Sequence, residues 1–146
     1  MFTYYVQYGG APYEQYECRG PTDFNHFIGV FDNFPWLAEI AKANEKPWGS
    51  SPTLSVKNTA DNKDLWVSMS GDGYSHGYLV GYIYSTTKKR LLGFGKPKKV
   101  RWLEIYLTRD MQAVKHYFKL FFAGKYDLLL SEFSKLQRFT ALEASN

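Results

Sequence analysis

Side chains that could support catalysis or bind a metal are few in this sequence, and their spacing matches no known site. The histidines are His26, His76 and His116, and the spacings HxH, HxxxH and HExxH do not occur, so the pattern of a zinc site is missing. Cys18 is the single cysteine, which excludes a disulfide framework within one chain. We therefore expect no metal, no cofactor and no enzymatic activity. An enzyme that uses Cys18 or His76 is the least favoured hypothesis, because no second catalytic group lies near either one in sequence.

A glycine-rich stretch at residues 70–73 (Ser-Gly-Asp-Gly) has the composition of a phosphate-binding loop. It lacks the Lys-Ser/Thr pair of a P-loop, and a predicted strand follows it where a phosphate loop would lead into a helix. A tight hairpin turn explains the glycines better.

Charge is unevenly distributed along the 146 residues, which carry a formal net charge of +4. Residues 1–72 hold five basic and nine acidic side chains, and residues 73–146 hold thirteen basic and five acidic ones, so the two halves carry −4 and +8. This bipolar distribution favours a macromolecular partner over a small-molecule pocket.

The basic stretch at residues 88–101 supports a nucleic-acid hypothesis. Its cations would neutralise phosphates, and Phe94 and Trp102 would stack on bases, as in a module that binds single strands. A long solvated hairpin loop is the alternative explanation, because lysines there discourage pairing between sheet edges. The candidate nucleic-acid-binding residues are Lys88, Lys89, Arg90, Lys96, Lys98, Lys99 and Arg101.

Aromatic residues make up 18% of the chain, with 12 Tyr, 11 Phe and 4 Trp. Tyrosine is amphipathic and is enriched in protein-binding surfaces. Several tyrosines fall on predicted strands, so either a tyrosine-rich face of the sheet is open to a partner or the rings fill the core. The strand tyrosines in question are Tyr4, Tyr78, Tyr82 and Tyr84.

The first half of the chain predicts strands at residues 3–8 and 11–20, followed by two helices. Asp23 can cap a helix whose apolar residues recur at helical spacing between Phe24 and Phe31. Pro35 can open a second helix. Its inward residues are expected to be Trp36, Leu37, Ile40 and Ala41.

The second half predicts strands at residues 53–57, 65–70, 78–84 and 100–107, joined by turns and by a loop at 85–98. Short connections favour an antiparallel meander. A helix capped by Thr108 or Asp110 follows, with Gly124 ending it. Its predicted apolar stripe is Met111, Val114, Tyr117, Phe118, Phe121 and Phe122.

A second short helix is expected over residues 126–136, and residues 138–146 are expected to fray. The fold class is therefore α+β: a twisted antiparallel β-sheet (a meander) with helices packed against it, and a C-terminal helix pair. The length suits a single domain over residues 1–146. No apolar run is long enough to span a membrane, and the first residues do not form a signal peptide, so a cytoplasmic protein is expected.

Residues 64–136 resemble bacterial immunity proteins of contact-dependent growth inhibition and polymorphic-toxin systems. The resemblance lies in a strand pair, DLWVSMSGD and GYLVGYIY, and in a capped amphipathic helix with an F-x-x-G-x-[YF]-like ending. The matching positions are Trp66, Gly81, Tyr82, Thr108, Phe122, Gly124 and Tyr126. The resemblance implies a small cytoplasmic protein that neutralises one toxin domain, often a nuclease, by blocking its active site or substrate surface. Inhibitors of basic nucleases are usually acidic, and the net charge of +4 departs from that pattern.

The preferred hypothesis is thus a non-enzymatic toxin inhibitor that binds a cognate protein toxin and no membrane. Acidic residues on exposed turns suit a basic partner. The candidate toxin-binding residues are Asp61, Asp64, Asp72, Tyr74 and His76.

Overall fold

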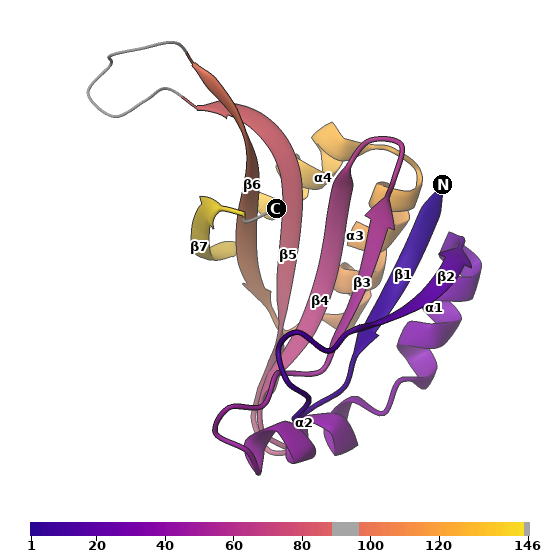
Figure 1. Cartoon of the computed structure of the whole chain (residues 1–146), viewed down its shortest axis with the longest axis vertical. Coiled ribbons are helices and arrows are strands. Elements are labelled where there is room, and N and C mark those ends of the chain that lie inside the picture. The colour runs from indigo at the N-terminus through magenta and orange to yellow at the C-terminus, as the bar shows by residue number, and fades with distance from the viewer. Residues whose placement is uncertain (89–96, 145–146) are drawn as a thin grey trace.

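The computed structural model describes residues 1–88 and 97–144 and has an α+β fold. One antiparallel sheet has the strand order β2-β1-β3-β4-β5-β6-β7, and helices pack against it (Figure 1). In chain order the elements are β1 (Phe2–Gln7), β2 (Glu17–Thr22), α1 (Phe24–Asn33), α2 (Trp36–Asn44), β3 (Thr53–Asn58), β4 (Lys63–Gly71), β5 (His76–Lys88), β6 (Lys98–Thr108), α3 (Met111–Phe122), α4 (Tyr126–Phe133) and β7 (Gln137–Glu143).

The two faces of the sheet differ because side chains alternate along each strand. The helices lie behind the sheet in Figure 1 and cover one face. Strands β3 and β4 direct their buried apolar residues, such as Leu54, Val56 and Val67, into the core on that face. Their alternate residues, such as Ser55 and Trp66, lie on the opposite face, which the helices leave open. The meander predicted for β3–β6 is confirmed.

Two aspartates begin helices as the sequence predicts. Asp23 Oδ1 accepts a hydrogen bond of 2.8 Å from the His26 backbone N–H at the start of α1. Asp110 Oδ1 accepts from Gln112 and Ala113 at the start of α3, so Asp110, and not Thr108, is the cap. Gly124 ends α3 with a φ of 70°, a conformation that favours glycine. The predicted stripe of α3 is buried or half-buried except at Met111, which is 43% exposed.

The inward face of α2 differs from the prediction. Trp36 and Ile40 are buried, but Leu37 and Ala41 are exposed, and Glu39 is buried instead. The Trp36 indole packs on Tyr78 at 6.0 Å between ring centroids, and this contact fixes the rotation of the helix. Residue 39 then faces Gly9, whose backbone N–H gives the Glu39 carboxylate a partner.

The predicted fraying of residues 138–146 is wrong for β7. Helix α4 ends at Phe133, earlier than expected, and the chain turns so that β7 pairs antiparallel with β6 (Figure 1). Without this partner β6 would present unpaired backbone groups at an open edge. The predicted second strand also begins later, at Glu17, and the expected loop at 85–98 is shorter, because pairing of β5 with β6 continues to Lys88 and Lys98. Within the described residues, no helix is long and apolar enough to cross a membrane.

Tyrosines of β5 and β6 lie in the covered face. Tyr78 and Tyr82 are buried, so these strand tyrosines fill the core and do not form a docking surface. Tyr84 and Tyr106 donate hydrogen bonds of 2.9 and 2.6 Å to the two carboxylate oxygens of Glu104. Burial, followed by this hydrogen bond, raises the pKa of Tyr84 from 10.0 to about 12.

This shift predicts a loss of stability in alkaline solution. An unfolded tyrosine ionises near its ordinary pKa of 10.0, whereas Tyr84 in the fold stays neutral until about 12. The stabilisation is therefore complete below pH 10 and is lost as the pH rises through this window. The urea midpoint should fall between pH 10 and pH 12, and Tyr84→Phe should make the fall shallower. Tyr74→Phe, at a fully exposed position, is the control. An unchanged slope in Tyr84→Phe would contradict the assignment.

Candidate binding groove on the open face of the sheet

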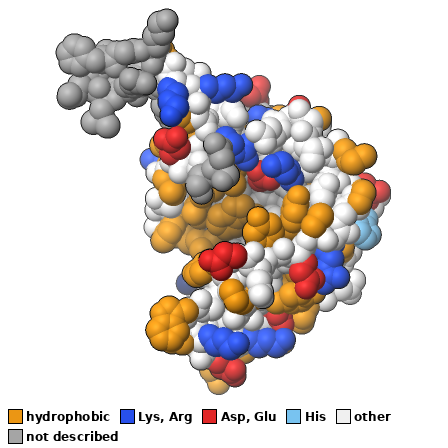
Figure 2. Space-filling view, in the orientation of Figure 1, with side chains coloured by type: hydrophobic (Ala, Val, Ile, Leu, Met, Phe, Trp, Pro, Cys, Tyr) orange, Lys and Arg blue, Asp and Glu red, His pale blue; other side chains and the backbone are white. Residues whose placement is uncertain are grey.

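The open face carries a groove with a cavity volume of about 610 Å³. Figure 2 shows the hollow, with hydrophobic side chains in its depth and charged side chains around it. Aromatic and hydroxyl side chains make up most of its lining. The lining residues are Tyr5, Gln7, Tyr13, Tyr16, Ser50, Ser51, Thr53, Ser55, Lys57, Asp64, Trp66, Ser68, Leu79 and Ile83.

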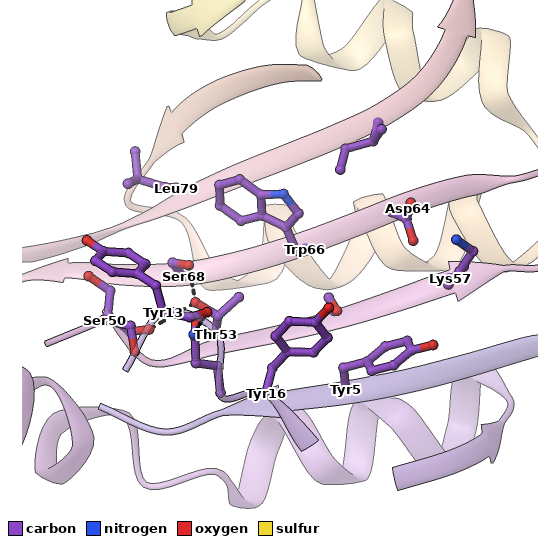
Figure 3. A pocket seen from close by; sticks show the side chains of 14 residues that line it. Tyr5, Tyr13, Tyr16, Ser50, Thr53, Lys57, Asp64, Trp66, Ser68 and Leu79 are labelled. Atoms are coloured by element: carbon purple, nitrogen blue, oxygen red, sulfur yellow. Dashed lines mark hydrogen bonds between the residues drawn. The ribbon is translucent and has the colours of Figure 1, made fainter. Parts of the chain in front are cut away.

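One wall of the groove comes from the connection between β1 and β2, residues 8–16. Figure 3 shows Tyr13 and Tyr16 on the same side of the sheet as Trp66 and Ser68, which both belong to β4. The Tyr16 ring meets the Tyr5 ring edge to face, with centroids 5.9 Å apart. Gln7 Nε2 donates a 3.0 Å hydrogen bond to the Tyr13 carbonyl, which ties the connection back to its own strand. Tyr13 and Tyr16 remain 70% and 61% exposed, so both rings are available to a partner.

Ser50 holds this wall in place from the connection between α2 and β3. Its single hydroxyl proton is shared between the carbonyls of Ala11 and Tyr8, at 2.9 and 3.3 Å. Its backbone exchanges two more hydrogen bonds, from Gly10 N–H to the Ser50 carbonyl and from Ser50 N–H to the Ala11 carbonyl. Ser50 is 1% exposed. These four bonds preorganise the wall, which lowers the cost of ordering it when a partner binds.

Glycines allow the backbone to approach this closely. A Cβ on Gly9 would lie 1.8 Å from the Glu39 carbonyl oxygen, and one on Gly49 would lie 2.6 Å from the Gly10 Cα. Both contacts are with backbone, which has little freedom to move away. The Gly-Gly pair, expected as a simple turn after the first strand, is thus the point where the wall packs against α2.

Trp66, whose indole lies over Gly81, forms part of the floor. The two residues are register partners on β4 and β5, and the indole covers the glycine so closely that a Cβ on Gly81 would fall 2.0 Å from the ring. A cross-strand aromatic ring placed over a glycine supplies the packing that the glycine lacks. Leu79 and Ile83 continue the apolar floor along β5, and Thr53 and Ser68 share a hydrogen bond beside it.

The charges of the groove are only partly paired. Arg101 Nη2 lies 2.6 Å from Asp64 Oδ2, and its Nη1 donates to the Asn62 carbonyl, also at 2.6 Å. Both charged side chains are less than a fifth exposed. Lys57 is the register partner of Asp64 on β3. Asp64 is a predicted toxin-binding residue and Arg101 a predicted nucleic-acid-binding residue, so the structure pairs two candidates that belong to different hypotheses.

The predicted toxin-binding residues do not form one cluster. Asp61 and Asp64 lie at the β3–β4 end of β4, whereas Asp72, Tyr74 and His76 lie at the β4–β5 end. Nine residues of β4 separate the ends by about 26 Å. Only Asp64 lines the groove.

The other predicted acids have local partners. Asp61 Oδ2 accepts hydrogen bonds from Asn58 and Tyr126. Asp72 Oδ1 accepts from the backbone N–H groups of Tyr74 and Ser75. These two bonds favour the charged carboxylate and lower the pKa of Asp72. Both acids therefore stabilise turns.

The predicted basic site is only partly described. Lys89, Arg90 and Lys96 lie outside the described residues, and Lys88 is described only by its place in β5. Lys98 and Lys99 are exposed at the start of β6.

Sequence reasoning missed Tyr13, Tyr16 and Ser50 as site residues, because their stretches predicted a strand and a loop. The tyrosines of the Tyr-Glu-Gln-Tyr run were the one available signal.

Comparison of the chain with protein-family models, curated proteins and solved structures found no match. Across residues 1–88 and 97–144, no three His, Cys, Asp or Glu side chains come together as a metal site. The groove is therefore interpreted from its own chemistry.

Ser50→Ala should loosen the wall of the groove. The variant loses the hydroxyl bonds to Tyr8 and Ala11, and we expect a loss of about 1–2 kcal/mol in the free energy of unfolding. Urea denaturation measures this loss, and faster amide exchange at Gly10 locates it. Ser51→Ala is the matched control, since that hydroxyl makes no hydrogen bond in the described part of the chain. Equal stability of the two variants would show that Ser50 does not hold the wall.

The ion pair across the floor gives a second expectation. Asp64→Asn and Arg101→Met should each cost about 1–2 kcal/mol, because each leaves a half-buried partner without its counter-charge. The double variant should lose less than the sum, by about 1 kcal/mol. Urea unfolding of the wild type, the two single variants and the double variant completes this double-mutant cycle. Strict additivity would contradict a direct contact between the two charges.

Proposed function

We propose that this chain is an immunity protein, acting without catalysis, whose open sheet face binds a cognate toxin domain and blocks it. The observation that carries the proposal is the groove itself: a preorganised hollow lined by three tyrosines, a tryptophan and several hydroxyl side chains. Tyrosine and serine together give rigid contact area and adaptable hydrogen bonding, the combination found in antibody paratopes.

The charge of the groove favours a protein partner over a nucleic acid. Lys57 and Asp64 are the charged side chains in its lining, and Arg101 beside them is paired. Binding to a phosphate backbone depends on cations that are free to replace counterions. A groove with only two charged lining residues and several aromatic anchors instead matches the core of a protein interface, where charged residues are depleted.

The proposed occupant is a protruding segment of the toxin with an apolar or aromatic tip. Such a tip would pack on Trp66, Leu79 and Ile83, while Tyr13 and Tyr16 close around it. A stable complex buries about 800 Å² on each partner, so contact would extend beyond the groove along the open face. The toxin class follows from the resemblance of residues 64–136 to immunity proteins. The net charge of +4 does not exclude a basic nuclease as the partner, because local complementarity at the interface decides contact, and few charged side chains line the groove.

The test uses the C-terminal domain of the protein encoded immediately upstream of this gene. We expect that domain to arrest growth alone, and coexpression of this chain to restore growth. In calorimetry, Tyr13→Ala and Tyr16→Ala should each weaken binding by about tenfold to a hundredfold, the range for aromatic anchors at interface centres.

Tyr74→Ala separates the groove from the turn residues that the sequence suggested. Tyr74 is fully exposed at the β4–β5 turn, far from the groove, so its loss should leave affinity unchanged. Weakening by Tyr74→Ala alone would move the interface to that turn and contradict the groove. An upstream domain that is neither toxic nor bound would contradict the immunity function. Salt-sensitive binding of single-stranded DNA would then favour the nucleic-acid alternative.

A further inference from the structure

On the open face, residues from neighbouring strands lie side by side in rows, because register partners on antiparallel strands point to the same side of a sheet. Ser55 and Trp66 are partners in one row, and Lys57 and Asp64 are partners in the next row on the same face. All four side chains line the groove. Diagonal neighbours such as Lys57 and Trp66 are about 7–8 Å apart, within reach of long and aromatic side chains, so both can contact one bound group.

Lys57 brings an unpaired cation to the groove. Its side chain is half-buried, and within residues 1–88 and 97–144 it makes no ion pair or hydrogen bond. Its register partner Asp64 could neutralise it, but Arg101 already lies 2.6 Å from the Asp64 carboxylate. Two cations therefore share one carboxylate in this row, which leaves one positive charge in excess.

Uncharged donors line the same groove. The Trp66 indole N–H, the Ser55 hydroxyl and the Tyr16 hydroxyl make no hydrogen bond in the described part of the chain. Figure 3 shows Lys57, Trp66 and Tyr16 on this side of the sheet. Asp64, the acid in the lining, is already engaged by Arg101. The groove therefore offers a positive charge and several donors to an acceptor that comes from a partner.

We propose that Lys57 binds an aspartate or glutamate side chain of the cognate toxin, carried next to the apolar tip that enters the groove. This inference rests on the proposed immunity function and adds the chemistry of the partner. The carboxylate accepts a charge-assisted hydrogen bond from Lys57 Nζ, and the neighbouring donors satisfy its remaining lone pairs. The contact selects the partner, because a toxin without the acid would cover the Lys57 charge and leave it unpaired.

Calorimetry with the purified upstream toxin domain and the whole chain tests the proposal. Lys57→Met keeps the length of the side chain and removes its charge, so affinity should fall by about tenfold. Lys57→Gln is a second uncharged variant, and its affinity should fall equally. Salt dependence is a further readout: the wild type should lose affinity as sodium chloride is raised, and both variants should lose less, because the screened ion pair is absent.

Lys63→Met is the matched control. Lys63 is also half-buried, but it lies one position before Asp64 on β4 and faces the helices, where its Nζ lies 5.0 Å from the centroid of the Tyr126 ring. Its loss should leave toxin affinity unchanged. Equal weakening by Lys63→Met and Lys57→Met would overturn the proposal, because binding would then follow net charge alone.

A double-mutant cycle identifies the acid on the toxin. Each aspartate and glutamate of the toxin domain is replaced by its amide in turn. One replacement should weaken binding to the wild type by about tenfold and cause little further loss with Lys57→Met. Additive effects for every acid would overturn the ion pair.

The outcomes separate this inference from the immunity function. Unchanged affinity in both Lys57 variants, with weakening by Tyr13→Ala, would overturn the acidic contact and leave the groove as the toxin-binding site. A toxin domain that does not bind the wild-type chain would overturn both.

Discussion

The groove depends on one close approach between backbones. Gly9 and Gly10 come so near to Glu39 and Gly49 that a side chain at Gly9 or Gly49 would overlap main-chain atoms. Ser50 then completes the contact with four hydrogen bonds. The connection after β1 is therefore fixed above the sheet at no cost to the core, since it packs on the end of α2. Without this contact the open face would lack one wall.

The charges of the open face act as part of its architecture. The Asp64–Arg101 pair crosses β5 from β4 to β6, and Arg101 also binds the Asn62 carbonyl in the β3–β4 turn. Two charges that the sequence assigns to rival functions thus stabilise the same surface. The net charges of the two halves of the sequence were consequently a poor guide to this face, because they do not show which charged side chains form ion pairs. Shape and aromatic content describe the face better.

Periodicity and capping chemistry predicted most of the fold. Asp23, Asp110 and Gly124 mark helix ends by local hydrogen bonding or backbone conformation, so their roles are readable from neighbouring residues. β7 was missed because its strand character comes from the edge of β6, a partner about 35 residues away in sequence. The wall residues were missed for the same reason, since Ser50 meets Ala11 across 39 positions. Contacts between residues far apart in the sequence position the groove, and local sequence patterns do not predict such contacts.

The Trp66–Gly81 contact has a consequence for divergence among related chains. The indole occupies the volume that any side chain at position 81 would need. Substitutions at positions 66 and 81 are therefore coupled. A bulkier residue at 81 is tolerated only when 66 becomes smaller, and a change at either site alone costs stability. An alignment of relatives should therefore show the two positions covarying. Each compatible pair of residues at 66 and 81 would give the groove floor a different shape. Among related chains, partner specificity would therefore change abruptly when the pair changes.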